Sequence, residues 1–285
     1  MRIGFVGTGL MGSRMAAHLV SPEHELFVYN RTRSKTAGLE AQGATVCESP
    51  ADVASRVEVL FSMLSDPDAV QAAALGTDGF LDALPGGATW VDCSTVHPEF
   101  SRRMAAAATE RGVRCIDAPV AGTLVPAEKG ELLILAGGDT DALRRVQPLL
   151  DRMGRKTVHV GGNGQGTAMK MVINTMLAQS MVAFSEATKL GESLGIEREA
   201  LLNGLIGGAV TAPYLAGKRD NFTAGQYEPA FPLKHMTKDL HLALLSAYQA
   251  GVALPATAAA GQLFAAAREH GRGDEDFSAL FDDIR

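Results

Sequence analysis

The 285-residue sequence lacks the features typical of disulfide-bonded, membrane-spanning and nucleic-acid-binding proteins. Its three cysteines, Cys47, Cys93 and Cys115, are far apart and show neither CxxC nor metal-ligand spacing. No run of about 18 or more apolar residues occurs, so we expect no membrane span. Acidic residues outnumber basic ones, 32 to 26, whereas a nucleic acid or an anionic membrane would need a basic face. We therefore expect no nucleic-acid partner and no membrane partner.

Metal sites and targeting segments are also missing from the sequence. The seven histidines are scattered, which argues against zinc chemistry, and we expect no metal. The chain opens directly into an apolar segment, Arg2–Val6, without the parts of a secretory signal. Together with the cysteine usage, this start predicts a cytoplasmic protein.

Short apolar runs alternate with helix-like stretches through the first half of the chain, a pattern that predicts a parallel sheet covered on both faces. The expected strands are Arg2–Val6, Glu25–Tyr29, Val57–Met63, Thr89–Asp92, Arg114–Asp117, Leu132–Ala136 and Lys156–Val160. The expected helices are Leu10–Val20, Ser34–Gln42, Pro98–Arg111 and Asp141–Met153.

The pattern changes after Gly161–Gly164, a cluster that is typical of a turn or hinge. A long helix is expected at Gly166–Gly195, followed by helical stretches that include Arg198–Ile206 and His235–Gln249. We predict an α/β domain over 1–162 and an all-helical substrate and oligomerisation domain over 163–285. Small residues in the long helix fit close helix packing or a subunit interface equally well, and we expect a homodimer or homotetramer. The acidic runs 274–276 and 282–283 are expected to lie in solvent.

A GxGxxG motif directly follows the first predicted strand and opens a helix; it consists of Gly7, Thr8, Gly9, Leu10, Met11 and Gly12. Glycine allows a tight turn and close approach to a pyrophosphate, and the helix N-terminus offers free N–H groups to the phosphates. A purely structural turn is the alternative. The context favours a doubly wound, Rossmann-type domain that binds a dinucleotide.

The end of the second strand indicates which dinucleotide binds. NAD sites usually carry an acidic residue there for the ribose 2′-hydroxyl, but this chain has Asn30, Arg31 and Thr32. An arginine can bind a 2′-phosphate, which a carboxylate would repel. We predict NADP(H), with Arg31 as the main contact and Asn30 and Thr32 assisting it; a solvated basic loop is the alternative.

A candidate proton donor lies at the start of the long helix. Gly166, Lys170 and Asn174 follow at i, i+4 and i+8 and so share a face, with apolar neighbours that would partly desolvate the lysine. We expect Gly166 to leave room for a ring and Asn174 to orient the ammonium and the substrate oxygen. The spacing alone fits a snorkelling lysine on a core helix equally well.

Five separated motifs resemble the β-hydroxyacid dehydrogenase family, which includes 3-hydroxyisobutyrate dehydrogenases and tartronate semialdehyde and glyoxylate/succinic semialdehyde reductases. They are Gly7–Gly12, Asp92–Thr95, Asp117–Val120 with Gly122, the Gly166/Lys170/Asn174 triad, and Phe231–Lys234 with Lys238-Asp239. The resemblance spans nearly the whole chain. It implies a catalytic lysine at Lys170, assisted by Asn174, in an active site between the two domains.

The resemblance also implies the remaining site residues. The cofactor would lie over Met63, Leu64 and Thr95, Lys238 would reach it from the helical domain, and Phe231 would close the pocket. The substrate would contact Lys170, Asn174 and Asp239, and its carboxylate the loop formed by Ala121, Gly122 and Thr123.

The substrate loop departs from the family pattern, because Ala121 stands where a serine is expected. One hydroxyl donor is missing, and Thr123 is a possible replacement. The sequence thus predicts an NADPH-dependent enzyme acting on a small carboxylate-bearing carbonyl or hydroxy acid, closest to the glyoxylate/succinic semialdehyde reductases. The alternatives are another carbonyl or an imine as substrate, or a dinucleotide-binding module without turnover. The physiological substrate, the direction of flux and the oligomer size stay open.

Overall fold

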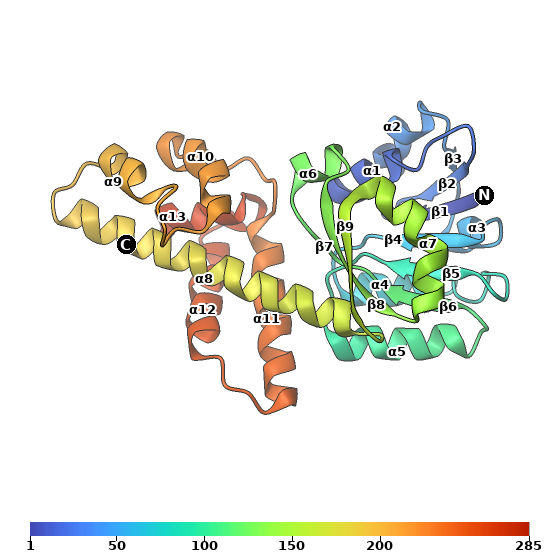
Figure 1. Cartoon of the computed structure of the whole chain (residues 1–285). Helices are drawn as coiled ribbons and strands as arrows, with labels where there is room; N and C mark the ends of the chain where they lie inside the picture. The colour runs from blue at the N-terminus through green and yellow to red at the C-terminus, as the bar shows by residue number, and fades with distance from the viewer. Residues whose placement is uncertain (285) are drawn as a thin grey trace. The chain divides into compact units, whose positions relative to one another are not determined.

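The computed structural model describes residues 1–284 and divides the chain into two compact units, Met1–Lys170 and Met171–Arg285. A 29-residue helix, α8 (Gln165–Ser193), begins in the first unit and continues into the second (Figure 1). The division therefore falls within α8, shortly after the boundary near residue 162 that the sequence suggests.

The first unit is built on a nine-stranded sheet with the order β3-β2-β1-β4-β5-β6-β8-β7, in which β9 pairs with β8. The strands are β1 (Arg2–Val6), β2 (Glu25–Tyr29), β3 (Thr45–Val46), β4 (Val59–Ser62), β5 (Thr89–Asp92), β6 (Arg114–Asp117), β7 (Val120–Ala121), β8 (Leu132–Gly138) and β9 (Gly154–Gly161). Strands β1 to β6 are parallel in the order 3-2-1-4-5-6, which is typical of the Rossmann fold. The predicted doubly wound domain is confirmed.

The expectation of an all-parallel sheet is wrong at one edge. Strand β8 runs antiparallel to both β6 and β7, and β9 runs parallel to β8. The connection from β6 to β8 contains β7 and a five-residue helix, α6 (Leu124–Glu128). Because a parallel crossover usually needs a longer helix, this connection returns β8 in the opposite direction.

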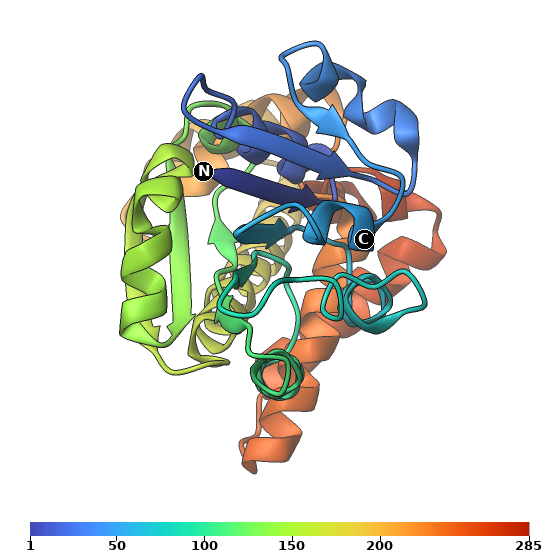
Figure 2. The same ribbon diagram turned by 90° about the vertical axis from the view of Figure 1, so that its right-hand side faces the viewer.

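Helices cover both faces of the sheet (Figure 2). One apolar core lies under α1, α2, α6 and α7, and the other lies under α3, α4 and α5. The bounds are α1 (Leu10–Ala17), η1 (Arg33–Thr36), α2 (Ala37–Glu40), α3 (Pro50–Ala54), α4 (Pro67–Leu75), α5 (Pro98–Thr109) and α7 (Thr140–Met153).

Side-chain caps define where several of these helices begin. Ser49 accepts a hydrogen bond from the backbone N–H of Asp52 at the start of α3, and Asp66 accepts one from Ala69 at the start of α4. A proline follows each cap at the first helical position, where its missing N–H costs nothing.

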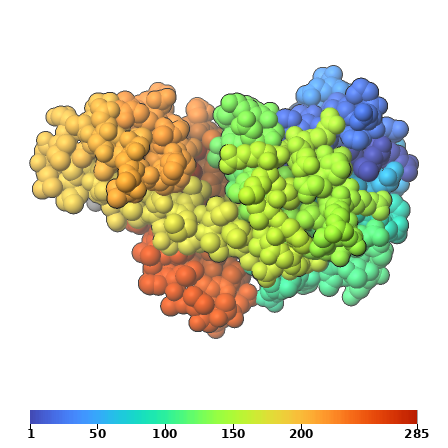
Figure 3. Space-filling view, in the orientation of Figure 1, coloured from blue at the N-terminus to red at the C-terminus, as the bar shows by residue number. Residues whose placement is uncertain are grey.

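The second unit is helical over its described residues, as predicted. Its elements are the main part of α8, α9 (Arg198–Leu205), η2 (Pro213–Lys218), α10 (Arg219–Ala224), α11 (Leu233–Ala250), α12 (Pro255–Glu269), η3 (Arg272–Asp274), η4 (Phe277–Ala279) and α13 (Leu280–Asp283). The aromatic core includes Phe222, Phe264, Phe277 and Phe281. Figure 3 shows the yellow atoms of α8 at the surface of this unit. Within residues 1–284, no helix combines the length and apolarity needed to cross a membrane.

Candidate active site

Two glycines of the turn between β1 and α1, Gly7 and Gly12, have no space for a side chain. Gly7 has a φ of +98°, and a Cβ there would lie 2.3 Å from the carbonyl oxygen of Met63. A Cβ on Gly12 would lie 1.9 Å from the carbonyl oxygen of Gly7. The backbone is thus exposed at the start of α1, where Leu10 and Met11 begin the helix. Free N–H groups and the positive end of the helix dipole favour an anion at this position.

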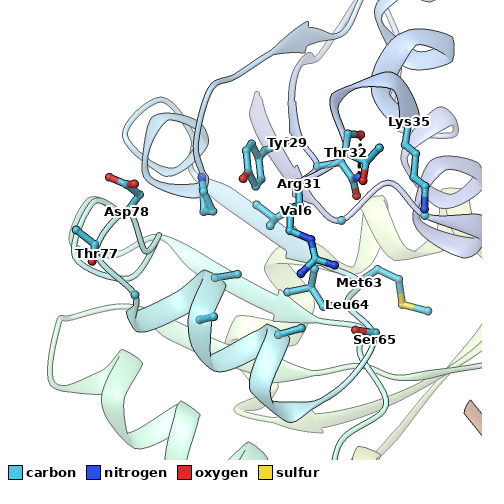
Figure 4. Close-up of a pocket in the computed structure, with 18 residues that line it drawn as sticks. Val6, Tyr29, Arg31, Thr32, Lys35, Met63, Leu64, Ser65, Thr77 and Asp78 are labelled. Carbon is cyan, nitrogen blue, oxygen red and sulfur yellow. Dashed lines mark hydrogen bonds between the residues drawn. The ribbon is translucent and has the colours of Figure 1, made fainter.

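A cavity of about 590 Å³ opens beside this turn (Figure 4). Its lining residues come from the ends of β1, β2 and β4 and from the segments around α3 and α4; they are Val6, Gly7, Gly9, Tyr29, Asn30, Arg31, Thr32, Lys35, Pro50, Met63, Leu64, Ser65, Ala69, Ala72, Ala73, Gly76, Thr77 and Asp78. The structure therefore brings together seven of the predicted cofactor residues: Gly7, Gly9, Asn30, Arg31, Thr32, Met63 and Leu64.

Asn30 joins two walls of the cavity. Its Oδ1 accepts a hydrogen bond from the backbone N–H of Thr8 at 3.0 Å, and its Nδ2 donates to the carbonyl of Thr32 at 3.0 Å. Thr8 is buried and donates from its hydroxyl to the carbonyl of Lys35. Asn30 thus fixes the β2 loop against the glycine turn.

A buried polar network supports the opposite wall. Asp92 Oδ1 accepts hydrogen bonds from the Ser62 hydroxyl at 2.7 Å and from the backbone N–H of Ser94 at 3.1 Å. Ser94 Oγ in turn accepts from the backbone N–H of Leu64. Burial raises the pKa of Asp92, while these hydrogen bonds lower it. The network positions the Met63–Leu64 segment at the cavity wall.

Two cations and one carboxylate line the cavity. In Figure 4 the Arg31 side chain points toward Leu64 and Ser65, and Lys35 lies on the far side of Thr32. The sequence prediction missed Lys35; the available signal was its place in a basic segment, four residues after Arg31. The carboxylate is that of Asp78, which belongs to the α4 segment and not to the end of β2. The β2 loop therefore contributes only the two cations, Arg31 and Lys35, to the cavity lining.

The cavity fits a dinucleotide. The glycine turn admits a pyrophosphate close to the backbone, the apolar side chains of Met63 and Leu64 can contact a ring, and the β2 loop offers cations to an anionic group. Thr95 follows β5 and is half-buried, but it does not line this cavity.

The start of α8 is fastened to the sheet by a carboxylate at the end of β6. Asp117 Oδ1 accepts a hydrogen bond from the backbone N–H of Gly164 at 2.7 Å. Its Oδ2 accepts from the backbone N–H of Thr167 at 2.9 Å and from the Thr167 hydroxyl at 3.2 Å. Burial raises the pKa of Asp117, and the three donors oppose that shift. The carboxylate acts as a cap supplied from a distant strand.

Gly166 has a different role from the one expected. A Cβ at this position would lie 2.2 Å from the carbonyl oxygen of Leu135 and 2.7 Å from that of Asp117. The missing side chain therefore lets α8 touch the backbone of β8, instead of leaving room for a ring. The preceding turn is also held, because Asn163 Nδ2 donates to the carbonyl of Cys115 at 2.8 Å.

Lys170 follows this fastened turn and is half-buried. Gly166 and Asn174, which share its helix face, are both buried. The expected partial burial of Lys170 is therefore in agreement with the structure.

In the second unit, three predicted site residues lie together. Asn174 Nδ2 donates a hydrogen bond of 2.6 Å to Asp239 Oδ2, and Lys238 Nζ lies 2.8 Å from Asp239 Oδ1. Asn174 and Asp239 are both buried. Asn174 Oδ1 is buried and receives no hydrogen bond from residues 1–284. Asp239 fixes the orientation of the amide, and the buried oxygen keeps an unused acceptor position.

The predicted substrate loop is only partly a loop. Ala121 ends β7, Gly122 has a φ of +128°, and Thr123 precedes α6. The Thr123 hydroxyl does not cap α6. Ala121 and Thr123 are half-buried and Gly122 is exposed.

Asp276 corrects the expectation that the acidic run 274–276 lies in solvent. It is fully buried, and Lys218 Nζ lies 2.8 Å from its carboxylate. Asp276 Oδ2 also accepts hydrogen bonds from the backbone N–H groups of Ala230 and Phe231. The buried pair therefore holds the segment that carries Phe231, which the sequence pattern could not reveal.

Two family models match the chain. The NAD binding domain of 6-phosphogluconate dehydrogenase matches residues 2–161, and the NAD-binding domain of NADP-dependent 3-hydroxyisobutyrate dehydrogenase matches residues 164–283. The chain belongs to the β-hydroxyacid dehydrogenase family. The resemblance inferred from the sequence motifs is confirmed.

Relatives and solved structures agree with this membership. Glyoxylate/succinic semialdehyde reductase 1 of Arabidopsis thaliana is 39% identical over 100% of this chain and 99% of its own. The 2-(hydroxymethyl)glutarate dehydrogenase of Eubacterium barkeri is 34% identical over 98% of this chain and 93% of its own. A structure of Mycobacterium tuberculosis 3-hydroxyisobutyrate dehydrogenase with L-serine has a TM-score of 0.89 and 29% identity, and covers 100% of this chain and 99% of the other. This β-hydroxyacid dehydrogenase is thus an oxidoreductase that uses a nicotinamide dinucleotide.

Replacing Asp117 by Asn tests the cap on α8. In the native protein, one carboxylate oxygen accepts from the N–H of Gly164 and the other from the N–H of Thr167. In either orientation of the asparagine amide, its NH₂ group would face one of these two N–H groups and leave it without an acceptor. We expect the free energy of unfolding to fall by about 1–3 kcal/mol, the cost of a buried unsatisfied group, as measured by urea denaturation.

Asp139→Asn is the matched control. Asp139 caps α7 through Oδ1 alone, which accepts from Asp141 and Ala142, so asparagine can replace it with little loss. Equal losses in the two variants would contradict the cap assigned to Asp117.

Proposed function

We propose that this protein is an NADPH-dependent reductase that interconverts a small hydroxy acid and its aldehyde or keto acid, with Lys170 as general acid in reduction. The observation that carries the proposal is the position of Lys170. It lies on the helix turn that Asp117 and Gly166 fasten to the same sheet that carries the glycine turn. A half-buried amine at that position suits proton transfer better than a solvated one.

We further propose a division of labour along the chain. Residues 1–162 hold the cofactor, and residues 163–285 supply substrate contacts and the oligomer interface of a homodimer or homotetramer. The matched ranges of the two family models support this boundary. A cytoplasmic location stays a prediction from the sequence, since relatives include a chloroplastic and a mitochondrial protein.

NADPH is favoured over NADH by the charge of the β2 loop. Arg31 and Lys35 line the cavity there, and Thr32 adds a hydroxyl. Asn30 occupies the place of the usual acidic residue and is engaged with the backbone. A 2′-phosphate would meet two cations and no carboxylate from this loop.

When bound, the nicotinamide ring supplies or accepts the hydride. In reduction, the Lys170 ammonium donates a proton to the carbonyl oxygen, which becomes the hydroxyl; in oxidation the neutral amine takes that proton back. The Oδ1 of Asn174, one helical turn later, accepts a hydrogen bond from the ammonium or the substrate hydroxyl. Asp239 keeps that oxygen presented by holding the amide nitrogen.

The segment Ala121–Thr123 is proposed to hold the substrate carboxylate. Gly122 can present its backbone N–H, and the Thr123 hydroxyl is not used as a helix cap. The relative with 39% identity is named a glyoxylate/succinic semialdehyde reductase, which supports a small aldehyde acid as substrate. Ala121, however, removes a hydroxyl donor and favours a second candidate function, reduction of a less polar carbonyl or an imine.

Arg31→Ala tests the cofactor preference. The loss of a charge-assisted hydrogen bond to the 2′-phosphate should raise the KM for NADPH by about 10- to 100-fold and leave the KM for NADH nearly unchanged. Arg33→Ala is the control, because Arg33 pairs with Glu48 and does not line the cavity. Equal KM values for NADPH and NADH in the unmodified protein would refute the NADPH assignment.

Lys170→Ala tests the proton donor. Turnover should fall by roughly 10²–10⁴-fold, while the Kd for NADPH, measured by fluorescence titration, should change little. Lys189→Ala removes a lysine from the same helix that pairs with Glu192, and should leave turnover intact. Normal turnover by the Lys170→Ala variant would rule out the proposed chemistry.

A substrate panel with NADPH separates the candidate functions. Glyoxylate, succinic semialdehyde and tartronate semialdehyde should give higher kcat/KM values than cyclic imines, because a carboxylate can bind at Gly122 and Thr123. A preference for imines would support the second candidate. Binding of NADPH without turnover of any compound would indicate a dinucleotide-binding module.

A further inference from the structure

Helix α6 follows the proposed substrate loop, residues 121–123, without any connecting segment, because Thr123 is the residue before its first turn. With five residues, α6 is far shorter than a helix that is stable by itself. Its position, and with it the position of the loop, must therefore be set by the elements that it contacts. The main one is α1, the helix that begins at the glycine turn (Figure 1).

Arg14 connects the end of α6 to the start of α1. Its Nη1 donates a hydrogen bond of 2.7 Å to the carbonyl of Leu10, a residue of the GxGxxG motif. Its Nε donates to Oε1 of Glu128, the last residue of α6, at 2.7 Å, and the two side chains form an ion pair. One guanidinium thus joins the glycine turn to the helix that follows the substrate loop.

His18 makes a second connection from the same face of α1. It follows Arg14 by four residues, so the two side chains are neighbours on the helix surface. Its Nε2 lies 2.8 Å from the carbonyl oxygen of Ala127 in α6. A carbonyl can only accept, so this ring nitrogen is the donor. The carbonyl of His18 in turn accepts a hydrogen bond of 2.7 Å from Nε of Arg152, which fastens the end of α1 to α7.

The turn after α6 is packed against the same two helices. Gly130 has a φ of +68°, and a Cβ there would lie 2.8 Å from the carbonyl oxygen of Arg152 and 3.4 Å from Cε1 of His18. On the inner side, Ala127 is fully buried in the same apolar core as Met15 of α1. The end of α6 is thus held by α1 and α7 together.

We propose that Arg14 and His18 are positioning residues for the substrate loop. They hold α6, and through it residues 121–123, at a fixed distance from the glycine turn. The site for the substrate carboxylate is thereby placed relative to the site for the cofactor phosphates. Both residues act through α6 and not on the substrate itself. The inference rests on the function proposed above, in which this loop holds the carboxylate.

A role in stability alone predicts a different result. The side chains of Arg14 and Glu128 are 27% and 53% exposed, and ion pairs at such positions contribute little to the stability of a fold. Hydrogen bonds to a carboxylate, in contrast, weaken steeply when a donor is displaced or turned. Loss of the ion pair should therefore change the binding of carboxylate substrates while the thermal midpoint stays nearly the same.

Charge reversal at the ion pair tests the inference at saturating NADPH. Glu128→Arg should lower the kcat/KM for succinic semialdehyde by about 3- to 10-fold, through KM, because two cations would repel each other between α1 and α6. The kcat/KM for butanal, which has a methyl group in place of the carboxylate, should stay nearly unchanged, as should the Kd for NADPH. Arg14→Glu combined with Glu128→Arg restores opposite charges and should recover most of the preference for succinic semialdehyde over butanal.

Asp82→Arg is the matched control for charge reversal. Asp82 forms another exposed ion pair of the same unit, with Arg111, and its variant should keep the substrate preference. An unchanged preference in Glu128→Arg, or a preference that the double variant fails to recover, would overturn the inference while the proposed function stands. A wild-type enzyme that shows no preference for succinic semialdehyde would refute the carboxylate site itself, and the inference with it.

Two variants of His18 test the second connection. His18→Leu removes the donor to Ala127 and should lower the preference for succinic semialdehyde over butanal. His18→Gln keeps an N–H donor on a side chain of similar reach and should retain that preference. Thermal midpoints of both variants show whether the fold is intact. Equal preferences in the two variants would contradict the positioning role of His18.

Discussion

The contact between the end of β6 and the start of α8 places the rest of the site. A helix start has four backbone N–H groups without partners inside the helix. Here the buried Asp117 carboxylate accepts from Gly164 and Thr167, and Gly166 lets α8 touch the backbone of β8. Moving the helix start would leave a buried carboxylate and several N–H groups unpaired, which is costly. Lys170 follows Thr167 by three residues on the same helix. Its position is therefore set by the sheet and not by a flexible connection.

The same sheet builds the candidate cofactor cavity from its strand ends, so the cavity and the proposed proton donor Lys170 are both anchored to this sheet. The backbone of the glycine turn offers contacts that any dinucleotide can use, because Gly7, Gly9 and Gly12 carry no side chains. The proposed discrimination between cofactors would come from the loop after β2, where Arg31 and Lys35 line the cavity and Asn30 holds the loop. In this proposal, binding and selectivity depend on separate groups, so a change at Arg31 should not disturb the glycine turn.

Local pattern was enough to predict most strands, the glycine turn and the long helix, because these depend on neighbouring residues. It failed where the outcome depends on a distant partner. The antiparallel direction of β8 follows from a short connection, not from its own apolar sequence. From the sequence we expected Asp276 to be a surface residue, because its partner Lys218 lies 58 positions away along the chain. Gly166 illustrates the same limit, because a side chain at this position is excluded by the backbone carbonyls of Leu135 and Asp117, which are distant in the sequence. The positions of Lys170 and Asn174 were predictable from spacing, whereas the Asp239 partner of Asn174 was not.

The start and the middle of helix α8 differ in their surroundings and in their charge. Its first turns carry Lys170 and the polar contacts that fasten it, and its middle carries no charge at all between residues 171 and 185. One side of that middle part packs into the aromatic core of the second unit through Ala178, Met181 and Phe184. A core requires only that buried side to be apolar, so the apolar character of the opposite, exposed side needs a separate cause. The packing of the second unit therefore does not account for the exposed Met176 and Leu190 on that side.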